Sequence, residues 1–332
     1  MTSQYLAHVP THVGAHVTGR AQAPVLPSEL GDKVGALREA SKAENTRRAY
    51  VSDWSRWQTW CHEHGLSPLP AHADTVSAYL ADMAGTLKVS TLRRHVATIS
   101  KAHQVAGFEN PCRETSVRDT VSGLRRTYGT AIDEAPGLLA DQLGQVLDSL
   151  TSDLSGVRDR ALLLVGWCAG LRRSEIAGLT WADITPDPDG LVLTLRKSKT
   201  DQEGQGRHVG IARSVNPERC PVVALATWRE MSAPGSPDSP VFVSVSKWGK
   251  LGSQLSGQAV AEIVQRRAKQ AGLTVHFRGH SLRKGLVQQA HLAGVSDSAV
   301  MATTGHKSVG MLRRYQGQAG LVSRSASKGL LA

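Results

Sequence analysis

Residues 279–283 read Gly-His-Ser-Leu-Arg, and they carry two of the side chains on which the interpretation of this sequence depends. His280 and Arg283 lie three positions apart at the expected start of a helix, so both project near one face of that helix. A helix start also carries partial positive charge, which attracts an anion. His306 and Tyr315 follow in the same order along the chain. The C-terminal region is therefore expected to be helical and to gather polar and cationic side chains.

Two further basic residues lie upstream of this stretch. Arg172 belongs to the run Ala-Gly-Leu-Arg-Arg-Ser-Glu, directly after a helix that Gly170 is expected to end. A guanidinium at such a junction can grip a phosphate through two hydrogen bonds, although an ion pair with Glu175 would explain it equally well. Lys199 lies in Lys-Ser-Lys-Thr at the expected tip of a hairpin, and Lys197 is an adjacent candidate for the same role.

Together these residues form the chemical set that cleaves a phosphate diester. Attack on phosphorus builds up negative charge, so the site needs fixed cationic donors, a nucleophile and a proton donor for the leaving oxygen. Two arginines, a lysine, two histidines and a tyrosine supply these groups without a metal ion or another cofactor. The phenol of Tyr315 has an ordinary pKa near ~10, so it needs cationic neighbours or a base to attack at neutral pH. His276 and His280 lie four apart, but no third ligand lies nearby, so no metal site is expected.

The charge of the chain points to a polyanionic partner. Its 332 residues have a net charge of +11, a pI near 9.8, 40% apolar and 20% charged residues. Both the segment 41–130, with twelve basic and eight acidic residues, and the rest of the chain after it are basic. This distribution is typical of two domains that both contact nucleic acid. No apolar run reaches the length of a membrane span, and no secretory signal is recognisable. The four cysteines have no metal-ligand spacing and fit a reducing cytoplasm.

Amphipathic helices begin after residue 40. Tyr50, Trp54, Trp57 and Cys61 follow one another at helical spacing and are expected to face a core. Three more helices, over about 74–83, from residue 90 and around 117–124, complete an expected all-helical bundle. The candidate DNA contacts are the basic residues on or beside these helices, mostly off the apolar stripes: Arg47, Arg48, Arg93, Arg94, Lys101, Arg118, Arg125 and Arg126.

The second half is expected to be mainly helical with a small sheet. Leu-Val-Leu-Thr-Leu at 191–195 and His-Val-Gly-Ile at 208–211 predict a hairpin. Helices are expected near 140–151, 157–169, from Pro221, and near 256–270, 281–293, 297–304 and 309–316, with a short strand at 241–245. Strands do not alternate with helices, which disfavours a Rossmann-type or barrel fold. The expected domains are a flexible tail (1–40), a helical DNA-binding domain (41–127), a linker (128–137), a catalytic domain (138–315) and a C-terminal tail (316–332).

The ordered set Arg, Lys, His-x-x-Arg, His or Trp, Tyr resembles the tyrosine recombinase (phage integrase-like) family. The flanking residues 170–176, 179–184 and 305–308 are similar to that family as well, and the resemblance runs from about residue 42 to 320. Within the family, the segments 57–61 and 196–200 look closest to the Cre-like members. His306 stands where those members carry a tryptophan, and both side chains can donate a hydrogen bond. The tail after Tyr315 is short, which leaves its docking on a neighbouring protomer open.

The resemblance implies a helical core-binding domain and a catalytic domain that form a C-shaped clamp around DNA. It implies that Tyr315 attacks the scissile phosphate, that Lys199 protonates the leaving 5′-oxygen and that His280 assists the phenolic proton. Arg172, Arg283 and His306 would hold the non-bridging oxygens. Glu175 would lie behind them and orient one of these groups.

The implied partners are double-stranded DNA sites and further copies of the chain. A monomer or dimer would bind one site, and a homotetramer would join two duplexes through a Holliday junction, without a membrane or a cofactor. The expected place of action is the cytoplasmic nucleoid of a prokaryote, with a chromosomal, phage or plasmid gene. Two alternatives stay open: a type IB topoisomerase or hairpin resolvase with the same site, and a DNA-binding regulator without catalysis.

Overall fold

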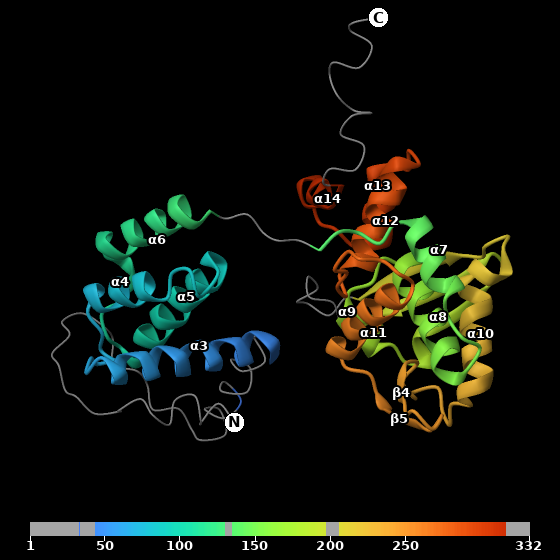
Figure 1. Ribbon diagram of the computed structural model, residues 1–332, viewed down its shortest axis with the longest axis horizontal. Helices are drawn as coiled ribbons and strands as arrows, with labels where there is room; N and C mark the ends of the chain where they lie inside the picture. Colours follow the sequence, from blue (N-terminus) through green and yellow to red (C-terminus); the bar gives the residue numbers. More distant parts are fainter. Residues whose placement is uncertain (1–32, 34–43, 130–134, 197–205, 317–332) are drawn as a thin grey trace, which may run out of the picture. The chain divides into compact units, whose positions relative to one another are not determined.

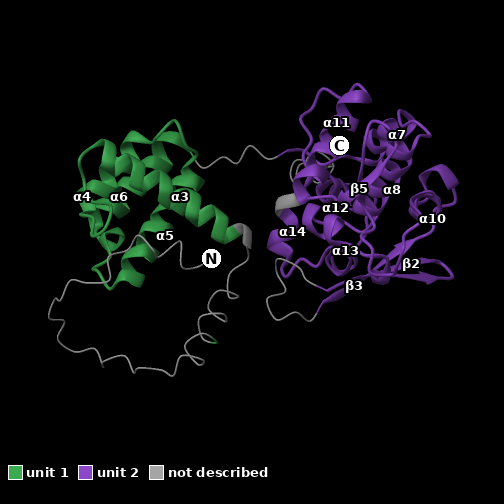
Figure 2. Ribbon diagram, turned by 90° about the horizontal axis from the view of Figure 1, so that it is seen from below, with its two compact units in different colours: residues 1–132 green, residues 133–332 purple. Residues whose placement is uncertain are grey.

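The computed structural model describes residue 33 and residues 44–129, 135–196 and 206–316 (Figure 1). The side chains of residues 44, 45 and 314–316 lie outside this description. Lys197, Lys199 and nearly all of the two predicted tails also lie outside the described residues. The chain divides into two compact units, residues 1–132 and 133–332, coloured separately in Figure 2. No helix in the described ranges combines the length and the apolarity that crossing a lipid bilayer requires.

The first unit is all-helical in its described part. Its elements are α3 (Glu44–Glu63), α4 (Ala73–Asp82), α5 (Val89–Ala106), a 3-10 turn η1 (Pro111–Arg113) and α6 (Thr115–Tyr128). The apolar stripe of α3 faces the core as predicted at Trp54, Trp57 and Cys61, but Tyr50 is only partly buried. Trp60, on the neighbouring face, is buried instead.

Aromatic side chains form the centre of this unit. The rings of Trp57 and Trp60 both make T-shaped contacts with the ring of Tyr79, with centroids 5.1 and 5.2 Å from it. Each indole N–H has an acceptor, the carbonyl oxygen of Pro68 for Trp57 and a carboxylate oxygen of Asp82 for Trp60. Buried tryptophans normally need such partners, so both indoles are satisfied inside an apolar core.

The second unit combines helices with two small antiparallel sheets. Its helices are α7 (Ala140–Asp148), α8 (Leu154–Cys168), α9 (Arg173–Gly178), α10 (Pro221–Ser232), α11 (Gly257–Gln270), α12 (Ser281–Leu292), α13 (Asp297–Thr304) and α14 (Val309–Gln316), with 3-10 turns η2 (Trp181–Asp183) and η3 (Pro217–Arg219). One sheet has the order β1 (Ile184–Asp187), β2 (Gly190–Leu195), β3 (Arg207–Ala212), and the other pairs β4 (Val243–Val245) with β5 (Leu251–Gln254). The hairpin β2–β3 was predicted, whereas β1 and β5 were not.

Helix α8 is the central helix of the second unit. It packs against α10 and against α12 (Figure 1), and its apolar side chains from residue 161 to residue 165 are all buried. Gly170 ends it with a φ of 57°, and an added Cβ there would lie 2.9 Å from side-chain atoms of Leu286 and Thr304. Only glycine tolerates both that φ and that approach. The chain therefore turns sharply at this point and delivers Arg172 to the start of α9.

The segment that enters the second unit crosses the start of α12 at close range. The backbone N–H of Leu138 donates to the carbonyl oxygen of Ser281, and the indole of Trp167 donates to the carbonyl of Leu138. A Cβ on Gly285 would overlap the carbonyl oxygen of Leu138. This crossing fixes α12 against α8, so His280 and Arg283 have a rigid support.

Candidate active site

Arg172 is held by Glu175 at the start of α9. Its backbone N–H donates to Oε2 of Glu175 at 2.8 Å, and its Nη1 donates to Oε1 at 2.6 Å. The side chain of Arg172 is 14% exposed and that of Glu175 only 3%. The ion pair that the sequence offered as an alternative explanation of Arg172 therefore exists. It is not a surface pair, and it leaves the remaining N–H groups of the guanidinium for another anion.

Arg283 lies almost fully buried on α12, with 1% of its surface exposed. Its Nη1 donates to the carbonyl oxygen of Gly170 at 2.7 Å, two residues before Arg172. Its Nη2 lies 3.2 Å from Nε2 of His306. The structure thus brings three of the predicted side chains, Arg172, Arg283 and His306, to one place from three separate segments.

The hydrogen bonds of His306 determine where its proton lies. Thr304 Oγ1 lies 2.6 Å from the carbonyl oxygen of Val300 and 2.6 Å from Nδ1 of His306. The carbonyl can only accept, so the threonine hydroxyl donates to it and accepts from Nδ1–H. Nε2 of His306 then accepts from Arg283. Burial and the nearby positive charges of Arg283 and Arg172 lower the pKa of His306 to about 4, so the imidazole is neutral at physiological pH.

His280 and Tyr315 lie on helices that pack together. His280 precedes α12 and is exposed, and its charge is close enough to act on His306. Helix α14 carries Tyr315 and packs on α12 and α13 (Figure 1). Leu312, fully buried against Val287 and Val300, anchors α14 there. The backbone of Tyr315 is thereby placed on this side of the unit, while the position of its phenol remains a prediction.

Sequence reasoning missed Arg207, the first residue of β3. Its guanidinium lies 3.5 Å from Oε2 of Glu175 and also donates to the carbonyl oxygen of Thr303. The signal was present, because a basic residue paired across the hairpin with buried Leu195 needs a partner inside the fold. Within the described ranges, no group of three or more His, Cys, Asp or Glu side chains could hold a metal ion.

The predicted DNA contacts of the first unit are mostly at its surface. Arg48, Arg93, Arg118, Arg125 and Arg126 are exposed, and Arg47 and Lys101 are partly buried. The side chain of Arg94 is exposed, but it forms a bidentate ion pair with the buried carboxylate of Asp53. Nε lies 2.6 Å from Oδ2 and Nη2 lies 2.8 Å from Oδ1. That pair neutralises its charge, so Arg94 is the weakest of these candidates for a phosphate contact.

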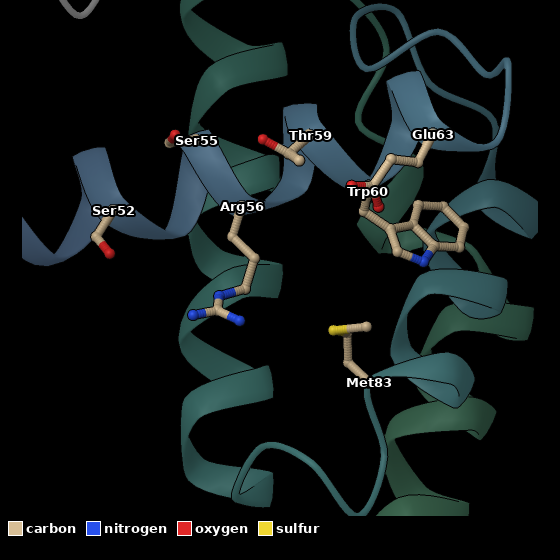
Figure 3. Close-up of a pocket in the computed structure, with 7 residues that line it drawn as sticks. All are labelled: Ser52, Ser55, Arg56, Thr59, Trp60, Glu63 and Met83. Carbon is tan, nitrogen blue, oxygen red and sulfur yellow. The ribbon is translucent and has the colours of Figure 1, made fainter.

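A shallow groove beside α3 adds one basic residue that sequence reasoning missed. Figure 3 shows Arg56 on α3 between the hydroxyl side chains of Ser52, Ser55 and Thr59, with Met83 across the groove. Arg56 is exposed, and Figure 3 shows its side chain extending from α3 to the side on which Met83 lies. Its position on α3 off the apolar stripe, like that of the other predicted basic residues, was the signal that could have identified it.

Two family patterns match this chain. The pattern of the phage integrase family covers residues 137–319, more than half of the chain, and that of the phage integrase N-terminal SAM-like domain covers residues 36–110. The chain belongs to the phage integrase family. An integrase/recombinase XerD homologue of Selenomonas ruminantium is 36% identical over 294 residues, which cover 87% of this chain and 86% of the relative.

Other similar proteins are more distant. The recombinase Cre of Escherichia phage P1 is 23% identical over 294 residues, covering 82% of this chain and 84% of Cre. A lambda integrase dimer bound to a core site has a TM-score of 0.58 at 19% identity, with 88% of this chain and 95% of that chain covered. The XerH recombinase in a post-cleavage complex gives 0.60 at 18% identity, with 79% and 73% covered. These structures establish a shared fold, and the predicted Cre-like detail stays a prediction.

Proposed function

We propose that this member of the phage integrase family is a tyrosine-type, site-specific DNA recombinase with Tyr315 as its nucleophile. The observation that carries the proposal is the convergence of Arg172, Arg283 and His306 beside the helix that bears Tyr315. The 36% identity to a XerD homologue supports the reaction class. The predicted catalytic set includes His280 and Lys199 as well.

The first step cuts one strand by transesterification. The phenolic oxygen of Tyr315 forms a bond to the scissile phosphorus, and the bond from phosphorus to the 5′-oxygen breaks. His280 assists removal of the phenolic proton, and Lys199 delivers a proton to the leaving 5′-oxygen. The products are a 3′-phosphotyrosyl link and a free 5′-hydroxyl. Attack by a 5′-hydroxyl from another strand reverses these bond changes and releases the tyrosine.

The buried cations explain how the site stabilises the transition state. Arg172 and Arg283 contribute two positive charges, and Glu175 and the nearby Arg207 cancel one another. A net positive charge therefore remains for the non-bridging oxygens, to which both guanidinium groups would donate. His306 would donate to them from Nε2 once it takes up a proton in the DNA complex. Fixed donors in a partly desolvated site are worth far more than in water, and loss of one costs about 3–4 kcal/mol of transition-state stabilisation.

The helical unit is proposed as the core-binding domain and the second unit as the catalytic domain, joined through residues 128–137 and closing around the duplex as a clamp. We further propose that four protomers act on two DNA sites and exchange strands through a Holliday junction. A lambda integrase tetramer bound to a Holliday junction shares this fold at 19% identity. The bacterial origin of the XerD homologue supports action on DNA inside a prokaryotic cell.

A pair of assays tests this proposal. Footprinting on DNA that flanks the gene locates a binding site, and a duplex nicked near that site is then incubated with the protein without ATP or divalent cations. A covalent protein–DNA adduct, followed by joining of two separate duplexes that carry the site, is expected. Relaxation of a supercoiled circle without exchange between duplexes would instead assign a topoisomerase. Binding without an adduct would assign a regulator.

A further inference from the structure

Arg207 lies at the centre of the candidate site without belonging to the predicted catalytic set. It begins β3, paired with Leu195 at the end of β2, and its side chain is 17% exposed. Burial lowers the pKa of its guanidinium, whereas the nearby Glu175 raises it. A long cationic side chain is rarely buried without a specific partner, so its contacts indicate what it does.

Those contacts join three separate segments. Nη2 of Arg207 lies 3.5 Å from Oε2 of Glu175, the carboxylate that also holds Arg172. Nη1 donates to the carbonyl oxygen of Thr303 in the last turn of α13, at 2.5 Å. The stem of the side chain packs under the turn that follows, because a Cβ added to Gly305 would lie 3.1 Å from its Cδ and Nε. His306 is the next residue.

The hydrogen bonding of Arg207 differs from that of a structural arginine in the same unit. Arg267 uses Nε, Nη1 and Nη2 to bind Asp159, Gln270 and Ser155. Nε of Arg207 is buried and finds no acceptor among the described residues. The two contacts that Arg207 does make lead to the supports of Arg172 and His306.

We propose that Arg207 is a positioning residue for the scissile phosphate. It fixes the Glu175 carboxylate, and through it Arg172, together with the turn that carries His306, so that both groups meet the same non-bridging oxygens. The proposal rests on the proposed recombinase function. Without the guanidinium, Glu175 keeps Arg172 as its partner but loses Arg207, and the end of α13 loses its hydrogen bond from β3. Misplacement of catalytic groups by about 1 Å can cost roughly 100-fold in rate.

The test compares single-turnover cleavage of pre-bound, nicked DNA by matched variants of the full chain. Arg207→Met keeps the packing of the aliphatic stem and removes the charge. Arg207→Lys restores the charge but not the planar guanidinium that donates from two nitrogens. Arg219→Met is the control, because Arg219 also binds a carboxylate, that of Asp148, and a backbone carbonyl, that of Gly144. Thermal unfolding and DNA affinity of each variant are measured alongside.

We expect cleavage by Arg207→Met to fall about 10- to 100-fold while DNA affinity stays within about twofold. Arg207→Lys should recover part of the rate, and Arg219→Met should cleave like the unaltered protein. Equal rates for the two methionine variants would overturn the proposal. So would a loss of DNA affinity that accounts for the whole effect. Absence of any adduct with the unaltered protein would instead overturn the recombinase function itself.

A second substrate separates positioning of the phosphate oxygens from positioning of the leaving group. A 5′-bridging phosphorothiolate places sulfur at the leaving position, and a thiolate leaves without being protonated. Since the contacts of Arg207 lead to Arg172 and His306, its defect should persist on this substrate. Full recovery of Arg207→Met on the sulfur substrate would show that Arg207 acts through the proton donor, and would contradict the proposal.

Discussion

Nη2 of Arg283 lies 3.2 Å from Nε2 of His306, although 23 residues and a whole helix separate them in the sequence. Both nitrogens can carry a hydrogen, but only one of them can donate a hydrogen bond to the other. Thr304 settles the question, because its hydroxyl oxygen accepts the hydrogen bond from Nδ1–H and so keeps the proton on that nitrogen. The arginine is therefore the donor, and His306 is a neutral histidine whose Nε2 lone pair faces a cation.

Replacing Thr304 by valine should impair cleavage. The variant keeps the shape of the side chain but removes the acceptor for Nδ1–H, so the histidine can place its proton on Nε2, against Arg283. The lost hydrogen bond is worth about 1 kcal/mol, or roughly a fivefold loss of rate. Thr303→Val is the matched control, since its hydroxyl bonds to a backbone carbonyl of the same helix. Thr304→Ser should stay active, and an equal loss in both valine variants would exclude this role.

The protonation state of His306 should change when DNA binds. With its pKa lowered to about 4, the imidazole of the free protein stays neutral as the pH falls from 7 to about 5. A bound phosphate brings negative charge and opposes the effect of the arginines, so the pKa should rise in the complex. NMR titration of the ring, free and bound to uncleavable DNA, measures both. A free-protein pKa near ~6.5 would contradict the geometry described for Thr304 and Arg283.

The helical unit should lose stability in mild acid because of His103. This side chain is fully buried, its Nδ1 donates to the carbonyl of Ile99, and its Nε2 accepts from the N–H of Ala71. Burial lowers its pKa. The unfolded chain therefore binds the proton first, near pH ~6.5, and the free energy of unfolding falls as the pH drops below that value towards the lower, folded pKa, by at most about 1.4 kcal/mol per pH unit.

Denaturant unfolding between pH 8 and pH 5 checks this dependence. In His103→Gln the free energy of unfolding should fall less as the pH drops towards 5, whatever the effect of the substitution at pH 8. His72→Gln should leave this fall unchanged, because the side chain of His72 is 77% exposed. An unaltered fall in His103→Gln would assign the pH dependence to another group.

Gly170→Ala should destabilise the catalytic unit and slow cleavage together. The φ of 57° costs a non-glycine residue about 1–2 kcal/mol, and the added Cβ would push against Leu286 and Thr304. Gly178→Ala, at the exposed end of α9 with open space around it, should be neutral or slightly stabilising. Thermal unfolding of both variants is the measurement, and equal melting temperatures would refute the account of this turn.

Much of the architecture was predictable where apolar side chains recur at helical spacing or alternate with polar ones along a strand. Buried positions at helical spacing identified α3 and α5, and the alternating residues of β3 identified the hairpin. Strand β5 gave no such signal, because all four of its residues are exposed. Strand β1 is short and mostly exposed, and only its pairing with β2 makes it a strand.

The site was predictable as a set of residues but not as a set of contacts. The order of Arg172, Arg283 and His306 could be read directly. The partnership of Arg207 with Glu175 joins positions 32 apart, and that of Arg94 with Asp53 joins positions 41 apart. Neither pair has a spacing that a helix or hairpin would bring together, so only the folded chain reveals that one arginine supports the site and the other is neutralised.

The central claim is that Tyr315 forms the bond to DNA, and peptide mapping of the covalent adduct tests it most directly. The unaltered protein, Tyr315→Phe and Tyr128→Phe, an exposed tyrosine of the helical unit, are each incubated with the nicked site and digested. The account predicts a nucleotide remnant on the peptide with Tyr315, an unchanged adduct in Tyr128→Phe, and DNA binding without an adduct in Tyr315→Phe. An adduct that survives in Tyr315→Phe, or maps to another residue, would contradict it.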